Sequence, residues 1–122
     1  MFGFGARPKI EGFEHKVMTV DEMRASGALI VDIRTPAEWY QTGVIEGAKL
    51  VTFQDPQSFL DAIRDDIADG RDVVLVCRSG NRTQAAGMYL AQMIDNKVIS
   101  AAGGMIEIVA RQGYQPVAPG AS

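Results

Sequence analysis

A chain of 122 residues supports one domain with a buried core, and its 47% hydrophobic and 22% charged residues are typical of a soluble globular protein. The net charge of −3 gives no reason to expect a nucleic-acid or membrane partner. One cysteine cannot form an internal disulfide, and with one histidine it cannot build a familiar zinc site without several carboxylates. Because residues 1–7 lack the apolar core of a signal peptide, we expect a cytoplasmic protein.

Capping boxes mark two helix starts in the first half of the chain. The T-x-x-E pattern at residues 19–22 predicts a helix that ends near residues 26–27. The same pattern at residues 35–38, with proline at the first helical position, predicts a second helix. Between them, the apolar run at residues 29–33 predicts a strand. The first dozen residues show no convincing period, and we expect a flexible arm over residues 1–13.

Strands and helices continue to alternate in the second half. The predicted elements are a strand at 49–51, a helix from 55 to 70, a strand at 72–76, a helix at 83–94, a strand at 97–100 and a helix at 105–112. Such alternation indicates an α/β fold, with a mainly parallel central sheet and helices on both faces. We expect this domain to cover residues 14–118, followed by a tail at 119–122.

The only cysteine, Cys77, lies between a predicted buried strand and a predicted helix. A thiol at the amino end of a helix faces unpaired N–H groups and the positive pole of that helix. Arg78 and Arg82 add positive charge, and both influences favour the reactive thiolate. Gly80 permits the positive φ that a tightly wound anion loop needs. Residues 77–83 therefore predict a sulfur nucleophile inside a cradle for a small anion, at the carboxyl end of a strand.

Three segments carry a family resemblance. They are VDIRTPAEWY at 31–40 with GVIEGA at 43–48, the loop CRSGNR at 77–82, and GG at 103–104 with GY at 113–114 and PV at 116–117. Together they resemble the rhodanese (thiosulfate sulfurtransferase-like) family in a single-domain form, over nearly all of residues 17–117. Two departures stand out. Val44 replaces the usual histidine, and the last helix lacks the tryptophan that is common there.

The resemblance implies a sulfurtransferase with a rhodanese-like fold. Cys77 would take sulfane sulfur from thiosulfate or a related donor as a persulfide, and pass it to a thiol or cyanide acceptor. No metal and no organic cofactor is implied. The implied donor-binding residues are Arg78, Ser79, Gly80, Asn81, Arg82 and Thr83. Asp32 and Arg34 would support the site by orienting the active loop and the neighbouring helix.

Several alternatives stay open at this point. The chain could be a persulfide carrier or a binding module that serves a protein partner, including a protein sulfur acceptor. A phosphatase or arsenate reductase of the same fold would need a Cys-x5-Arg loop, but here Arg82 follows Cys77 after four residues, and Thr83 stands in the arginine position. A Cys-His hydrolase would have only His15 as its base. Finally, a lone cysteine can simply be a buried core residue.

Overall fold

The computed structural model describes residues 10–120, which form a five-stranded sheet with helices around it. The strands are β1 (Phe13–Lys16), β2 (Leu29–Asp32), β3 (Lys49–Leu50), β4 (Val73–Val76) and β5 (Val98–Ala101). The helices are α1 (Val20–Ala25), α2 (Pro36–Thr42), α3 (Pro56–Ile63), α4 (Asn81–Leu90), α5 (Gly104–Ile106) and the π-helical segment η1 (Glu107–Arg111). Most of the expected arm (1–9) and the end of the tail (121–122) lie outside the described residues.

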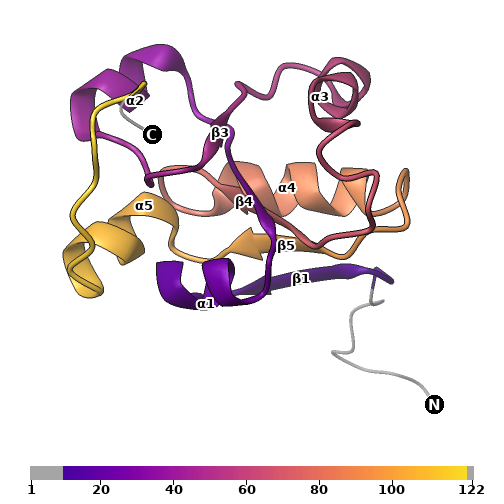
Figure 1. The fold of residues 1–122 in the computed structure, drawn as a ribbon, viewed down its shortest axis with the longest axis horizontal. Coiled ribbons are helices and arrows are strands. Elements are labelled where there is room, and N and C mark those ends of the chain that lie inside the picture. The colour runs from indigo at the N-terminus through magenta and orange to yellow at the C-terminus, as the bar shows by residue number, and fades with distance from the viewer. Residues whose placement is uncertain (1–9, 121–122) are drawn as a thin grey trace.

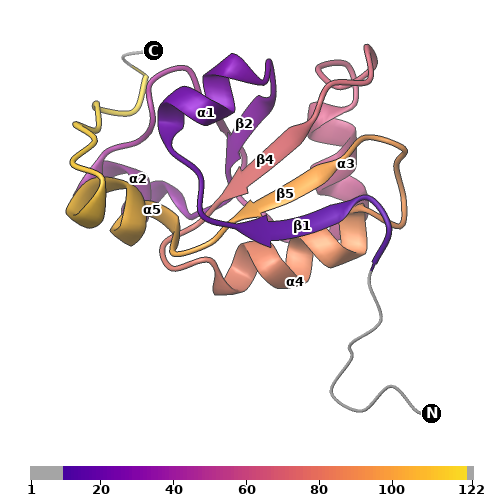
Figure 2. The same cartoon turned by 90° about the horizontal axis from the view of Figure 1, so that it is seen from below.

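All neighbouring strands run parallel, in the order β1-β5-β4-β2-β3 (Figure 1). Figure 2 shows α1 on one side of this sheet and α4 on the other, with α2 and α5 beyond the carboxyl ends of the strands. The prediction of an α/β fold with a parallel sheet and helices on both faces is therefore confirmed. Because Cys77 follows β4, the middle strand of the sheet, it lies at this carboxyl edge.

The sequence of the central strand β4 is apolar without interruption because the strand is buried on both faces. All four of its residues are completely buried. Val73 and Leu75 join the core under α3 and α4, whereas Val74 and Val76 join the core under α1 and α5. Successive side chains of a strand point to opposite faces, so a strand covered on both faces needs apolar residues at every position.

The sequence pattern missed β1 and overextended α3. Strand β1 pairs with β5 at the edge of the sheet, and its sequence Phe-Glu-His-Lys contains a single apolar residue. A strand with little to bury leaves no clear period-two signal. Helix α3 ends at Ile63, and the Lys49 ammonium caps this end by binding the Ala62 carbonyl oxygen (2.8 Å) and the Asp66 carboxylate.

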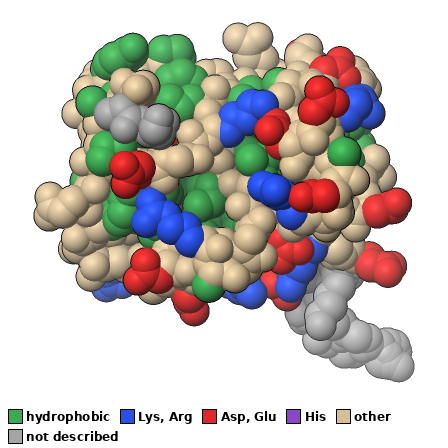
Figure 3. All heavy atoms as spheres, viewed as in Figure 1, with side chains coloured by type: hydrophobic (Ala, Val, Ile, Leu, Met, Phe, Trp, Pro, Cys, Tyr) green, Lys and Arg blue, Asp and Glu red, His purple; other side chains and the backbone are tan. Residues whose placement is uncertain are grey.

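The surface carries mixed charge. Acidic and basic side chains are interspersed over the face shown in Figure 3. Several charged side chains of the described residues form local pairs, such as Arg64 with Asp61 and Arg71 with Asp69. Within residues 10–120, no helix has the length and apolar character to cross a membrane.

Candidate active site

The loop that follows β4 brings a backbone N–H group to the sulfur of Cys77. Gly80 has a φ of +96° and forms the cap of α4, so the chain turns sharply between the nucleophile and the helix. Its N–H donates to the Cys77 Sγ at 3.1 Å. A side chain at Gly80 would place its Cβ 3.0 Å from the backbone nitrogen of Gly103. Positive φ and close backbone approach together favour glycine at this position.

The start of α5 holds the carbonyl groups of the same loop. The N–H of Met105 donates to the Cys77 carbonyl oxygen at 2.8 Å, and the N–H of Ile106 donates to the Arg78 carbonyl oxygen at 3.1 Å. Gly104 has a φ of +55°, and a Cβ there would lie only 2.4 Å from the Cys77 carbonyl oxygen. These contacts anchor two carbonyls of the loop to α5, because each is bound by an α5 amide.

The thiol of Cys77 is enclosed. Cys77 is free and has 0% exposed surface, and the Thr83 hydroxyl lies 3.7 Å from its sulfur. Arg78 and Ser79 are exposed beside it, as are Asn81 and Arg82. The sulfur therefore lies beneath the exposed side chains of this loop.

Arg82 binds a carboxylate on α2. Its two terminal nitrogens donate to the Glu38 carboxylate at 2.8 and 2.7 Å. These hydrogen bonds lower the pKa of Glu38 to about 2; partial burial opposes the shift, and the Thr35 backbone N–H adds to it. The same pair raises the pKa of Arg82. A guanidinium has five N–H donors, so Arg82 keeps three for another oxyanion.

Asp32 and Arg34 form a buried ion pair at the end of β2. Each is 1% exposed, and the guanidinium Nη2 lies 2.8 Å from the Asp32 Oδ2. Arg34 also donates to the Thr42 hydroxyl (2.6 Å) and the Gly43 carbonyl oxygen (2.8 Å), while the Trp39 indole N–H donates to Asp32 (3.1 Å). These contacts fix α2, which carries Glu38. The pair is thus connected to the active loop through the contact between Glu38 and Arg82.

The structure adds two residues that the sequence prediction did not place in the site. Ser100 of β5 lies 2.7 Å from the Thr83 hydroxyl oxygen, and His15 of β1 lies 2.8 Å from the Ser100 hydroxyl oxygen through Nδ1. A serine inside an otherwise apolar strand was the only signal for Ser100. His15 was hidden because the strand that carries it was not predicted.

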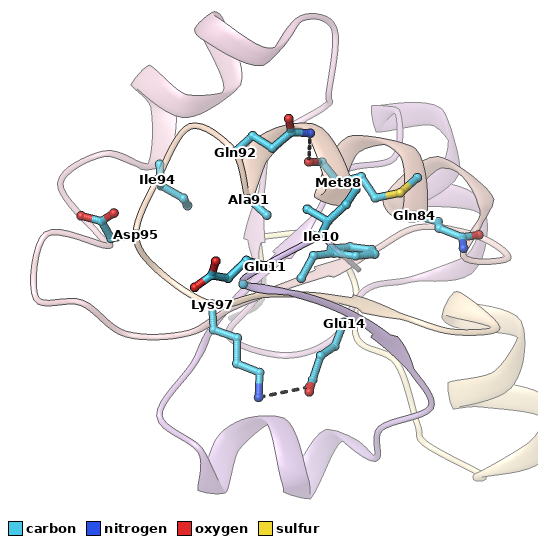
Figure 4. Close-up of a pocket in the computed structure, with 12 residues that line it drawn as sticks. Ile10, Glu11, Glu14, Gln84, Met88, Ala91, Gln92, Ile94, Asp95 and Lys97 are labelled. Atoms are coloured by element: carbon cyan, nitrogen blue, oxygen red, sulfur yellow. Dashed lines mark hydrogen bonds and ion pairs between the residues drawn. The ribbon is translucent and has the colours of Figure 1, made fainter. Parts of the chain in front are cut away.

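Two cavities flank α4. The larger is an open groove of about 1230 Å³ between β1 and α4, with Phe13, Met88 and Lys97 in its lining (Figure 4). None of the described residues of the active loop lines it, so it is separate from the chemistry. The smaller cavity, about 430 Å³, is lined by Arg82, Tyr89 and other residues of α4, and by residues of the segments that follow β2 and β3. It lies directly beside the start of α4.

Comparisons with known proteins identify the family of this chain. The family model of the rhodanese-like domain matches residues 17–111 of the sequence. The chain belongs to the rhodanese-like domain family. The family resemblance seen in the sequence is thereby confirmed.

Rhodanese relatives cover most of this chain. A sulfurtransferase of Allochromatium vinosum is 43% identical over 91 residues, which cover 75% of this chain and 79% of the relative. The thiosulfate sulfurtransferase GlpE of Pseudomonas entomophila is 42% identical over 82 residues, covering 67% and 71%. The crystal structure of a rhodanese-related protein from Thermoplasma volcanium has a TM-score of 0.62 at 20% identity, covering 82% of this chain and 95% of that one. At that identity the superposition supports the fold.

Proposed function

We propose that this protein is a thiosulfate sulfurtransferase in which Cys77 carries the transferred sulfur. The observation that carries the proposal is the hydrogen bond from the Gly80 N–H to the Cys77 Sγ, at the amino end of α4. A backbone donor and a helix pole aimed at one sulfur atom stabilise negative charge there. The names of the curated relatives agree with this chemistry.

The first half-reaction moves sulfur onto the enzyme. The Cys77 thiolate attacks the sulfane sulfur of thiosulfate, and a new S–S bond forms. The original S–S bond of thiosulfate breaks, and its electron pair leaves with sulfite. Cys77 then carries a persulfide whose terminal sulfur is anionic, so the total charge is unchanged. This is covalent catalysis of the ping-pong type.

The second half-reaction releases the sulfur. A thiolate or cyanide attacks the terminal sulfur of the persulfide, and the electron pair of the broken S–S bond returns to Cys77. The product is a persulfide of the acceptor, or thiocyanate. A protein thiol is chemically as suitable an acceptor as a small one. Because Cys77 must stay a free thiol between turnovers, we place the protein in the reducing cytoplasm.

The remaining predicted site residues keep supporting roles in the proposal. Arg78 and the three free N–H donors of Arg82 would hold the oxygens of the donor, because guanidinium groups suit forked binding of oxyanions. The other loop residues, Ser79, Asn81 and Thr83, would donate hydroxyl or amide hydrogen bonds. Asp32 and Arg34 would act indirectly, through α2 and Glu38.

Mass spectrometry of the intact protein tests the proposal. After incubation with thiosulfate, the parent should gain one sulfur atom on Cys77, and a reductant or cyanide should remove it. Cys77→Ser should gain none, while circular dichroism shows an unchanged fold. Thiosulfate turnover is then compared with transfer from a protein persulfide. Gain of sulfur only from the protein donor would identify a carrier. A folded Cys77→Ser variant with turnover near the parent rate would refute the role of Cys77.

A further inference from the structure

A line of hydrogen bonds joins the buried sulfur to the only histidine of the chain. It runs from the Cys77 Sγ to the Thr83 hydroxyl (3.7 Å), from there to the Ser100 hydroxyl (2.7 Å), and on to the His15 Nδ1 (2.8 Å). Cys77, Thr83 and Ser100 each have 0% exposed surface, whereas His15 is exposed. The line therefore connects an enclosed thiol with solvent.

Most charged side chains on the elements around His15 form ion pairs with one another. On β1, side chains alternate between the faces, so Glu14 and Lys16 lie opposite to His15. Glu14 pairs with Lys16 (3.0 Å) and with Lys97 ahead of β5 (3.1 Å), and Figure 4 shows the Glu14–Lys97 pair on the side of β1 away from α4. On α4, Arg82 is bound to Glu38. Arg78, in the loop, is exposed.

His15 itself shares its face with α4 and the active loop. Phe13, two residues before it, packs on the α4 side, where a Cβ at Gly87 would lie 2.5 Å from its ring. The ring of His15 also comes close to the loop, because a Cβ at Gly80 would lie 3.4 Å from its Cε1. The ionisable group joined to His15 by hydrogen bonds is thus Cys77.

We propose that His15 is the proton acceptor of Cys77, acting through the hydroxyls of Thr83 and Ser100. The Cys77 S–H gives its proton to the Thr83 oxygen, the Thr83 proton moves to Ser100, and the Ser100 proton moves to the His15 Nδ1. The products are a thiolate and an imidazolium, and both hydroxyls are regenerated. In this state the Thr83 hydroxyl donates toward the sulfur instead of toward its alternative acceptor, the Gly80 carbonyl oxygen (3.1 Å).

This assignment rests on the proposed role of Cys77 as nucleophile. That role requires a group that removes the proton of the thiol, and His15 is the group assigned to it. The sulfur has no contact with solvent, so water cannot take its proton directly. A protonated thiol acceptor also brings a proton that must leave the site in the second half-reaction. A path through two hydroxyls to an exposed imidazole serves both needs, since imidazole changes its charge near neutral pH. His15 is therefore a positioning and proton-accepting residue outside the loop.

Alkylation of Cys77 by iodoacetamide tests the path without using sulfur transfer. His15→Asn keeps a hydrogen-bonding group near the Nδ1 position but cannot take the proton. At pH 7 we expect its alkylation rate to fall about tenfold, which is below the ~10²–10⁴-fold range of direct acid–base catalysis because two hydroxyls intervene. Ser100→Ala should lower the rate similarly, and the double variant should be no slower than either single one. Lys16→Gln, on the opposite face of β1, should match the parent.

Proton-detected NMR of the histidine ring gives the reciprocal measurement. His15 is the only histidine, so its ring signals need no assignment. Cys77→Ser removes the thiol that would give its proton to the ring, so the His15 ring signals at pH 7 should differ from those of the parent. The difference should vanish in the Ser100→Ala background. An alkylation rate of His15→Asn equal to that of the parent would overturn the inference, as would unchanged His15 ring signals in Cys77→Ser. Persulfide formation in the parent reports separately on the proposed function.

Discussion

Glu38 joins α2 to the first turn of α4 through its two hydrogen bonds with Arg82, at 2.8 and 2.7 Å. The same carboxylate accepts the Thr35 backbone N–H at 3.2 Å and completes the capping box of α2. One side chain thus caps a helix and holds an arginine of the active loop. The Glu38 side chain is 22% exposed and the Arg82 side chain 46%, so solvent screens the pair only in part.

The first prediction concerns the pH dependence of this pair. The pKa of Glu38 is lowered in the folded protein to about 2, from 4.5. A lowered pKa stabilises the folded state above the unfolded value and loses that effect as pH falls through the folded value. Glu38→Gln should therefore lower the free energy of unfolding by about 1–2 kcal/mol at pH 7, after allowance for screening. The difference from the parent should shrink between about pH 4.5 and 2.

Urea unfolding at a series of pH values measures this difference. Asp61→Asn is the matched control, because it removes a carboxylate whose arginine partner, Arg64, is on the open surface. Its effect at pH 7 should be smaller than that of Glu38→Gln. A Glu38→Gln difference that stays constant down to pH 2 would show that the carboxylate charge does not stabilise the fold.

The sequence predicted what local contacts determine. Both capping boxes form, at Thr19 and at Thr35, because their partners are three residues apart. The strand–Cys77–helix unit was also predictable, since an apolar run, a glycine and a helical segment follow one another directly.

Contacts between residues far apart in the chain could not be predicted from local sequence patterns. Glu38 and Arg82 are 44 residues apart, and His15 and Ser100 are 85 apart. Both pairs depend on the order of the strands in the sheet. For His15 and Ser100, β1 must lie beside β5, and the one apolar residue of β1 gives no signal of that strand. No local pattern encodes that order, so the sequence indicated Asp32 and Arg34 as supports of the loop but not Glu38, Ser100 or His15.

The second prediction concerns Gly104, where a side chain has no room. Gly104→Ala would place a Cβ 2.4 Å from the Cys77 carbonyl oxygen and displace the loop from α5. We expect loss of most sulfur transfer and a lower melting temperature. Gly113→Ala is the matched control, because Gly113 also has positive φ (+76°) but a Cβ there would meet nothing within 4 Å. It should lose about 1 kcal/mol of stability and keep its activity. Equal activity losses would rule out the close approach as the cause.

The third prediction concerns the buried pair of Asp32 and Arg34. Arg34→Met would leave the Asp32 carboxylate buried without its main partner, and breaking such a pair costs about 3–5 kcal/mol. We expect a strongly lowered melting temperature by circular dichroism. Arg64→Met removes an exposed arginine of similar size and should change the melting temperature little. If both variants have similar melting temperatures, burial of the Asp32–Arg34 pair does not determine how much it contributes to stability.

The last prediction is that the length of the active loop determines which substrate the protein accepts. The parent should turn over thiosulfate with cyanide and leave aryl phosphates almost untouched. Four residues separate Cys77 from Arg82, one fewer than in a Cys-x5-Arg loop, and two of the five Arg82 N–H donors are bound to Glu38. The loop therefore offers few donors to enclose a tetrahedral phosphoryl group, and losing one well-placed donor typically costs about 10²–10³-fold in rate.

Inserting a glycine between Asn81 and Arg82 gives a Cys-x5-Arg loop. We expect this variant to transfer sulfur from thiosulfate more slowly than the parent, because the wider loop moves its N–H groups away from the sulfur. Binding of phosphate or arsenate, measured by calorimetry, should appear in it and be absent from the parent. The same insertion between Gly70 and Arg71, in the turn before β4, is the control for the effect of an added residue. Aryl phosphatase activity in the unmodified chain, without sulfur transfer, would reverse the choice between the two enzymes.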